Sequence, residues 1–241
     1  MLDKIIIDGL SFALPLFIMA IGGIYSERSG ITNLALEGLQ GAGAFVGALV
    51  ATFLMLALPS DSQIPYYAAM FTAMIGGMLY AMLHAVLCVN FKANQVISGV
   101  VINILAMALT VFLTKVVNRI AFGAASDKFL LNVSSRWTIP GLSSIPVIGA
   151  VFTDMYPFEV IIVVVAVIAW YVLYRTRYGM HLRACGDNPQ AVDAAGIDVA
   201  KIRFSAVMIS GALSGLAGMC FAYSISAKYA STIYVGYGYL S

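Results

Sequence analysis

Charged residues are scarce in this sequence. Asp, Glu, Lys and Arg make up 10% of its 241 residues, whereas soluble domains carry roughly 25%. The formal net charge is only +2, which argues against a nucleic acid as the partner. Hydrophobic residues make up 61% of the chain, and the mean hydropathy is +0.95. This composition is that of an integral membrane protein in contact with a lipid bilayer.

Cysteine is also scarce. Cys88, Cys185 and Cys220 lie far apart, and the sequence contains no CxxC motif. The sequence therefore predicts neither a disulfide framework nor a metal site. It also lacks the GxxxxGK[ST] phosphate loop and the HExxH zinc motif. We expect no cofactor in this chain and no enzymatic activity of its own.

Six apolar segments are long enough, or nearly so, to cross about 30 Å of hydrocarbon as helices. They are residues 9–25, 39–58, 65–89, 97–117, 158–174 and 204–227. The first is expected to be retained, because the N-terminal stretch carries acids and lacks a small-residue cleavage site. We therefore predict one all-α domain over 1–241, a polytopic transmembrane helical bundle with about six spans.

Basic residues predict the orientation of this bundle. Five of the 13 lie within 175–203, so this loop is expected to be cytoplasmic. Counting spans backwards places 118–157 and the N-terminus outside, an assignment that a re-entrant segment between 26 and 45 would reverse. The 118–157 stretch is too long for a simple turn. It either packs over the outer mouth or contains a re-entrant piece around 139–152.

Small residues form two stripes within the spans. Gly43 and Gly47 make a GxxxG pair, and SGALSGLAG occupies 210–218. Small residues let helix backbones approach closely in lipid, where no hydrophobic effect drives helices together. We expect tight packing inside one bundle, with a protomer interface as the alternative.

Polar residues at membrane depth are candidates for a hydrophilic pathway. Asn33 and Glu37 are four residues apart and are expected on one helical face. Asn94 and Ser98 have the same spacing at the start of the fourth span, and Asn103 lies deeper in that span. The structural alternative is helix capping for Asn94 and Ser98, and bonding between helices for the others.

Two rival functions remain open on these residues alone. An intramembrane serine protease would pair Ser214 with His84. Packing in the small-residue stripe accounts for Ser214, however, and a helix-to-helix hydrogen bond is the favoured interpretation of His84. A secondary transporter or channel would explain the spans and the buried polar groups, but it would not need the polar loop at 175–203.

That polar loop contains GDNPQAVDAAGI at 186–197, which has the signals of a short helix. Asp187 and Asn188 suit the N-cap, Pro189 suits the first turn, and Gly196 suits the residue after the last turn. The pattern predicts about two turns over 187–196, too short to be stable alone in water. The helix must pack on its own bundle or bind a cytoplasmic partner.

Three blocks of the sequence resemble one family. RACGDNPQAVDAAGI (183–197) resembles the cytoplasmic coupling loop, RAxGxNPxAAxxAGI, of permease subunits in bacterial ABC importers of the ribose, branched-chain amino-acid and nucleoside group. GGIYSERSGITNLALEG (22–38) resembles GGxxSERxGxxNxxxEG of the same group, and its SER triplet favours the nucleoside-type branch. ANQVISGVVIN (93–103) resembles a third block of that branch.

The resemblance implies a bacterial inner-membrane permease subunit that forms the translocation pathway of an ATP-driven nucleoside importer. Its implied partners are a second permease subunit, identical or homologous, a cytoplasmic ABC ATPase that binds ATP and Mg²⁺, and an extracytoplasmic nucleoside-binding protein. Family members usually continue for several more spans, so the resemblance also predicts a bundle that is incomplete at its C-terminus.

The resemblance and the polar pattern together give two sets of candidate residues. For coupling to the ATPase they are Arg183, Gly186, Asp187, Asn188, Pro189, Ala191, Ala195 and Gly196. For the substrate pathway they are Asn33, Glu37, Asn94, Ser98 and Asn103.

Overall fold

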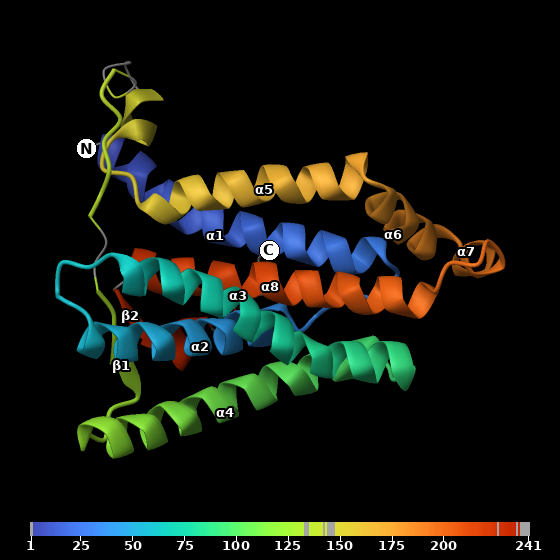
Figure 1. Cartoon of the computed structure of the whole chain (residues 1–241), viewed down its shortest axis with the longest axis horizontal. Helices are drawn as coiled ribbons and strands as arrows, with labels where there is room; N and C mark the ends of the chain where they lie inside the picture. The colour runs from blue at the N-terminus through green and yellow to red at the C-terminus, as the bar shows by residue number, and fades with distance from the viewer. Residues whose placement is uncertain are drawn as a thin grey trace.

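Six long helices run side by side in the computed structural model, which describes residues 2–132, 135–141, 143, 148–225, 227–234 and 236 (Figure 1). They are α1 (Leu2–Arg28), α2 (Leu36–Ala57), α3 (Ile64–Ala85), α4 (Gln95–Phe122), α5 (Pro157–Arg175) and α8 (Val199–Ile225). Each is long and apolar enough to cross a membrane, and each contains most of one predicted segment. The predicted polytopic all-α bundle is confirmed.

Helices α2, α3 and α8 form the close-packed centre of the bundle. Gly43 of α2 lies against Gly215 of α8 and the Ala73 carbonyl of α3, and Gly77 of α3 lies against Gly211 of α8. A methyl group at any of these glycines would overlap the neighbouring backbone. The small-residue stripes therefore bring helices of one chain together, as expected.

A short sheet ends the last span earlier than predicted. Helix α8 stops at Ile225 rather than 227, because the chain turns into strand β2 (Lys228–Ala230). This strand pairs antiparallel with β1 (Lys128–Leu130), with Phe129 opposite Tyr229. Both rings are buried and pack with Phe45 of α2. A 3-10 turn, η3 (Ser231–Tyr234), follows β2.

The two ends of the bundle contain different structural elements. Two short helices, α6 (Arg177–Asp187) and α7 (Pro189–Ala194), lie at one end, and the start of α1 lies at the other (Figure 1). A π-helix, η1 (Val86–Asn90), extends α3 directly. The N-terminal part of α1 and the 175–203 segment thus occupy opposite ends, as the span count predicts.

The long connection between α4 and α5 contains a second 3-10 turn, η2 (Ile148–Phe152), which contacts α1. Trp137 and Met155 exchange backbone hydrogen bonds of 2.8 Å. The re-entrant piece considered around 139–152 falls partly on residues 142 and 144–147, which lie outside the described residues.

Candidate functional site

The predicted two-turn helix is present as α7, bounded by its expected signals. The Asn188 side chain accepts a hydrogen bond from the Ala191 amide at 3.1 Å, and Pro189 is the first helical residue. Gly196 follows the last turn with φ +79°, a left-handed conformation that favours glycine. Asp187, also suggested as an N-cap, is instead the last residue of α6. Asn188 alone caps α7.

Helix α6 was not predicted. It begins after a sharp bend from α5, where the Thr176 hydroxyl caps it by accepting from the Gly179 amide at 3.2 Å. Its buried residues, Gly179, Leu182 and Cys185, recur at a helical spacing, but glycine and cysteine are weak helix formers and only Leu182 is a strong apolar signal. On α6 the Tyr178 hydroxyl shares a 2.8 Å hydrogen bond with Ser205 of α8, and burial raises the pKa of this tyrosine.

A single side chain anchors α7 to the bundle. Val192 is 6% exposed, whereas Ala191, Ala194 and Ala195 are exposed and form a small apolar face. Asp193 is also exposed. This leaves most of the surface of α7 free to contact another protein.

The end of α6 is bound tightly to the end of α1. The Arg203 guanidinium donates to the Ser29 carbonyl at 3.0 Å and to the Cys185 carbonyl at 3.2 Å. Gly186 lies so close to the Arg28 carbonyl that no side chain would fit. Burial raises the pKa of the Cys185 thiol, and the Arg203 charge partly offsets this. These contacts join the α6–α7 unit to the segment that follows α1.

That segment, residues 29–35, is not helical, which corrects one expectation. Asn33 was placed on the same helical face as Glu37, but α2 begins only at Leu36. The Ser, Gly, Thr and Asn residues of this stretch favour turns over helix. Ser26, at the end of α1, donates to the Ile31 carbonyl at 2.8 Å. The SER triplet thus shapes the exit from α1.

The non-helical segment lies inside the bundle and is held by two asparagines. Asn33 accepts from the Ala35 amide at 3.0 Å and donates to the Ser210 hydroxyl of α8 at 3.0 Å. Asn103 of α4 donates to the Leu34 carbonyl at 2.8 Å and accepts from the Gly38 amide at 2.7 Å. Non-helical backbone at membrane depth requires such partners, because lipid supplies none.

Glu37 and Asn103 meet at a small cleft between α2 and α4. Glu37 is half-buried, and its carboxylate accepts from the Gly236 amide at 3.1 Å. The other polar residues that line this cleft are Thr110, Ser231 and Tyr234. Sequence reasoning missed Ser231 and Tyr234, because only the pairing of β2 with β1 brings η3 back against α2.

The two remaining pathway candidates lie elsewhere: Asn94 caps a helix as the structural alternative expected, whereas Ser98 bonds a neighbouring helix instead of capping one. Asn94 caps α4, accepting from the amides of Val96 at 3.0 Å and Ile97 at 3.2 Å. Ser98 is buried, and its hydroxyl lies 2.9 Å from His84 Nδ1 on α3. His84 therefore bonds a neighbouring helix, as favoured.

The protease alternative finds no support in these contacts. Ser214 donates to the Ser210 carbonyl of its own helix at 2.8 Å, and His84 is engaged by Ser98. The nucleophile and the base are thus each occupied by a different partner.

Gln40 is a further polar residue near the cleft. It is fully buried on α2, one turn beyond Glu37, and neither amide atom has a hydrogen-bond partner within the described residues. A buried amide without partners is costly. Its spacing from Glu37 is the only sequence signal that points to it.

A family model described as "Branched-chain amino acid transport system / permease component" matches residues 5–240 of this chain. The chain belongs to this permease family. Its membership and its six apolar helices identify a multi-pass membrane protein, a transport subunit rather than an enzyme. Permeases of ABC transporters work with ATPase and substrate-binding partners. No solved structure matches the chain.

Several relatives are similar to almost the whole of this chain. A guanosine ABC transporter permease, NupQ of Bacillus subtilis, is 35% identical over 233 residues, which is 96% of this chain and 71% of the relative. A nucleoside ABC transporter permease, NupC of Lactococcus lactis, is 39% identical over 246 residues, 100% of this chain and 74% of the relative. A putative glucose ABC transporter permease of Haloferax volcanii is 29% identical, over 95% of this chain and 65% of the relative.

Proposed function

We propose that this permease imports nucleosides and that a separate cytoplasmic ATPase drives it by docking on α7. The observation that carries the coupling is the double hydrogen bond of Arg203 to Ser29 and Cys185. It joins the α6–α7 unit to the non-helical segment that leads to Glu37. The two nucleoside-type relatives support the substrate class.

In this coupling, the rigid α6–α7 unit is attached to the non-helical segment 29–35, whose backbone can change conformation. Of the residues predicted for coupling, the contact face comprises Gly186, Asp187, Asn188, Pro189, Ala191, Ala195 and Gly196. Arg183 is left out of this face, because its guanidinium lies beside the Tyr174 ring of α5. ATP-driven closure of the ATPase displaces α7 and, with it, the end of α6. The Arg203 contacts pass this displacement to Ser29. Residues 29–35 can change their backbone angles without breaking helical hydrogen bonds, so they absorb the motion as a hinge.

The cleft holds only about 20 Å³ in this structure, so a nucleoside enters it only after α2 and α4 separate during transport. Its chemistry then suits a neutral, hydroxyl-rich solute. The Glu37 carboxylate accepts hydrogen bonds from sugar hydroxyls, and the Ser231 hydroxyl lines the same cleft. Tyr234 adds an aromatic ring to the same cleft. Among the original candidates, Glu37 therefore contacts the solute, whereas Asn33, Asn94, Ser98 and Asn103 hold the pathway in shape.

The remaining partners follow from the same mechanism. A second permease subunit completes the pathway, and an extracytoplasmic nucleoside-binding protein delivers the solute at the end opposite α7. ATP and Mg²⁺ bind the ATPase rather than this chain.

Uptake in matched cells tests the solute. We would compare uptake of labelled guanosine, uridine, ribose and leucine in cells with and without the permease. Loss of nucleoside uptake alone is the expected result. Loss of ribose or leucine uptake with nucleoside uptake intact would reject the substrate class.

Purification from native membranes tests the partner. The permease is extracted in mild detergent and the co-purifying proteins are identified by mass spectrometry. A P-loop ATPase is expected with the parent, and less of it with Asn188→Ala, which loses the cap of α7. Recovery of the permease without any ATPase would reject the ATP-driven mechanism.

A further inference from the structure

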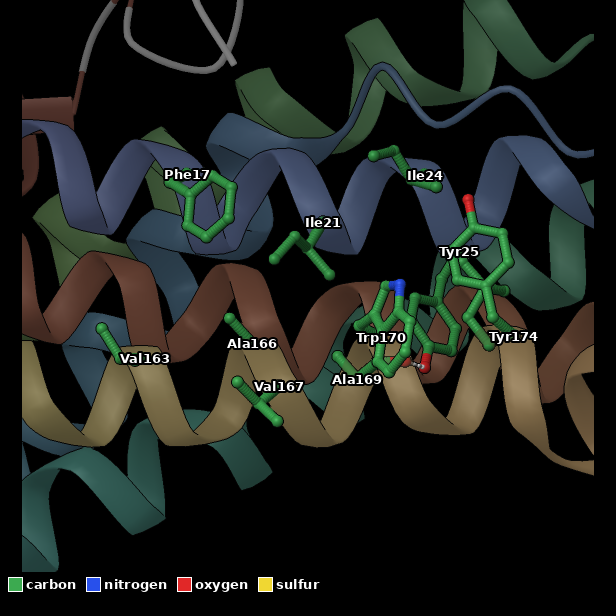
Figure 2. Close-up of a pocket in the computed structure, with 11 residues that line it drawn as sticks. Phe17, Ile21, Ile24, Tyr25, Val163, Ala166, Val167, Ala169, Trp170 and Tyr174 are labelled. Atoms are coloured by element: carbon green, nitrogen blue, oxygen red, sulfur yellow. Dashed lines mark hydrogen bonds between the residues drawn. The ribbon is translucent and has the colours of Figure 1, made fainter.

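An apolar groove of about 490 Å³ runs along the outside of the bundle between α1 and α5. Phe17, Ile21 and Ile24 line it from α1, and Val163, Val167 and Trp170 line it from α5 (Figure 2). The only buried hydroxyl in its lining belongs to Tyr25, which already donates to the Ala169 carbonyl at 2.5 Å. The Tyr25 hydroxyl is therefore not free to bind a polar ligand in the groove.

The side chains that line the groove are exposed on the outside of the bundle, and the groove matches one leaflet in length. Phe17, Val167 and Trp170 are 51%, 59% and 51% exposed. From Val163 to Tyr174 the α5 wall rises about 16 Å, at 1.5 Å per residue. Half of the hydrocarbon core is about 15 Å thick. The groove therefore extends from the bilayer centre to the interface at the α6–α7 end.

Positive charge gathers at the interfacial end of the groove. The Arg175 guanidinium lies 5.8 Å from the Trp170 ring centroid, and that of Arg183 lies 5.3 Å from the Tyr174 ring centroid. Within the described part of the chain, the salt bridges within 4 Å do not involve either arginine. Basic residues at this position attract the headgroups of anionic lipids.

We propose that this groove binds one anionic phospholipid, with an acyl chain between α1 and α5 and the phosphate beside Arg175 and Arg183. The groove is too small for a protein helix, because a helix segment of the same length occupies on the order of 1,000 Å³. An acyl chain needs no hydrogen bonds, and its anionic headgroup pairs with the arginines. This lipid site is independent of the transported solute.

Quenching of Trp170 fluorescence by brominated lipids tests the proposal. The permease has two tryptophans, so Trp137→Phe leaves Trp170 as the single reporter. This protein is reconstituted with brominated phosphatidylglycerol or brominated phosphatidylcholine at equal mole fractions. We expect phosphatidylglycerol to quench with about 25-fold higher apparent affinity, since each of the two arginines near an anionic headgroup contributes about five-fold.

Two pairs of variants test headgroup recognition and acyl-chain binding separately. Arg175→Gln should reduce the preference to about five-fold, because Arg183 remains. Lys201→Gln, which removes the same charge elsewhere at this end, should keep the full preference. Val163→Phe should weaken quenching by filling the groove. Val164→Phe should not, because Val164 is equally exposed, at 51% against 50% for Val163, but does not line the groove.

Two results would overturn the proposal. Equal quenching by both lipids in the parent would show an ordinary lipid-facing surface without a site. Protection of Trp170 from both lipids, together with crosslinking of Val163→Cys to another protein or to a second copy, would show a protein interface instead.

Discussion

Arg203, in the first turns of α8, binds the Ser29 carbonyl through its Nε at 3.0 Å. Ser29 directly follows α1, and the second carbonyl bound by Arg203, that of Cys185, lies in the last turn of α6. The final carbonyls of a helix have no partner within the helix and carry partial negative charge. One cation therefore stabilises the ends of two helices and fixes their relative position.

Arg203→Gln should uncouple the transporter. Glutamine cannot reach both carbonyls and carries no charge, so two charge-assisted hydrogen bonds, about 1.5–3 kcal/mol each, are lost. We expect uptake in proteoliposomes containing the partner ATPase to fall at least ten-fold, while the ATPase still co-purifies. Uptake and ATP hydrolysis are measured on the same preparation.

Lys201→Gln is the matched control for this variant. Lys201 also lies at the start of α8, but it is 85% exposed and its ion pair with Asp198 lies in solvent. Exposed pairs contribute little to stability. Its uptake should stay near that of the parent. Normal uptake by Arg203→Gln would show that the contact only stabilises the fold.

Cysteine labelling should map the docking face directly. Cys88, Cys185 and Cys220 are buried, and burial raises the pKa of Cys185 despite the nearby Arg203, so maleimide should react slowly with the parent. Ala194→Cys should react quickly in the isolated permease. Bound ATPase should slow that reaction at least five-fold.

Ser60→Cys provides the control for labelling. Ser60 is exposed in the connection between α2 and α3, at the end of the bundle opposite α7. Its reaction rate should be the same with and without the ATPase. Equal rates at Ala194→Cys with and without bound ATPase would place the docking site away from α7.

Acidification should remove the contribution of Asp198, which caps the start of α8. Its carboxylate accepts from the Lys201 amide at 3.0 Å, and this bond, together with the Lys201 ammonium, lowers its pKa below the ordinary value of 3.8. A carboxylate whose pKa is lower in the folded state stabilises the fold at pH values above its ordinary pKa. This stabilisation is lost as the pH falls through the folded-state pKa. The difference in Tm between parent and Asp198→Asn should be constant above about pH 5 and shrink below about pH 4. A constant difference down to pH 3 would contradict the role of the charge.

The sequence alone was sufficient to predict the structural features that have a local or periodic cause. The six spans follow from length and hydropathy, and α7 follows from Asn188, Pro189 and Gly196 at their expected positions. Small residues at 43 and 215 predicted close helix packing. Each of these signals lies within one helix or one turn, so no knowledge of the fold was needed.

Features that depend on distant segments could not be predicted. The break between Asn33 and Glu37 depends on Asn103, which lies on another helix and bonds both sides of it. The cleft includes Tyr234 only because β2 pairs with β1 far back in the chain. These are tertiary effects that helical spacing does not encode.

Substitutions at Asn103 and Glu37 should separate structure from transport. Asn103→Ala loses the bonds to Leu34 and Gly38 and should destabilise the protein by about 1–2 kcal/mol, the range for hydrogen bonds between membrane helices. Glu37→Gln keeps its size and one acceptor oxygen for Gly236, so its Tm should change little. Its KM for nucleoside uptake should rise several-fold, because an amide accepts sugar hydroxyls less strongly than a carboxylate does. Thermal unfolding and initial rates of uptake are measured for both variants. A large loss of Tm with unchanged KM in Glu37→Gln would assign Glu37 to the fold and remove it from the pathway.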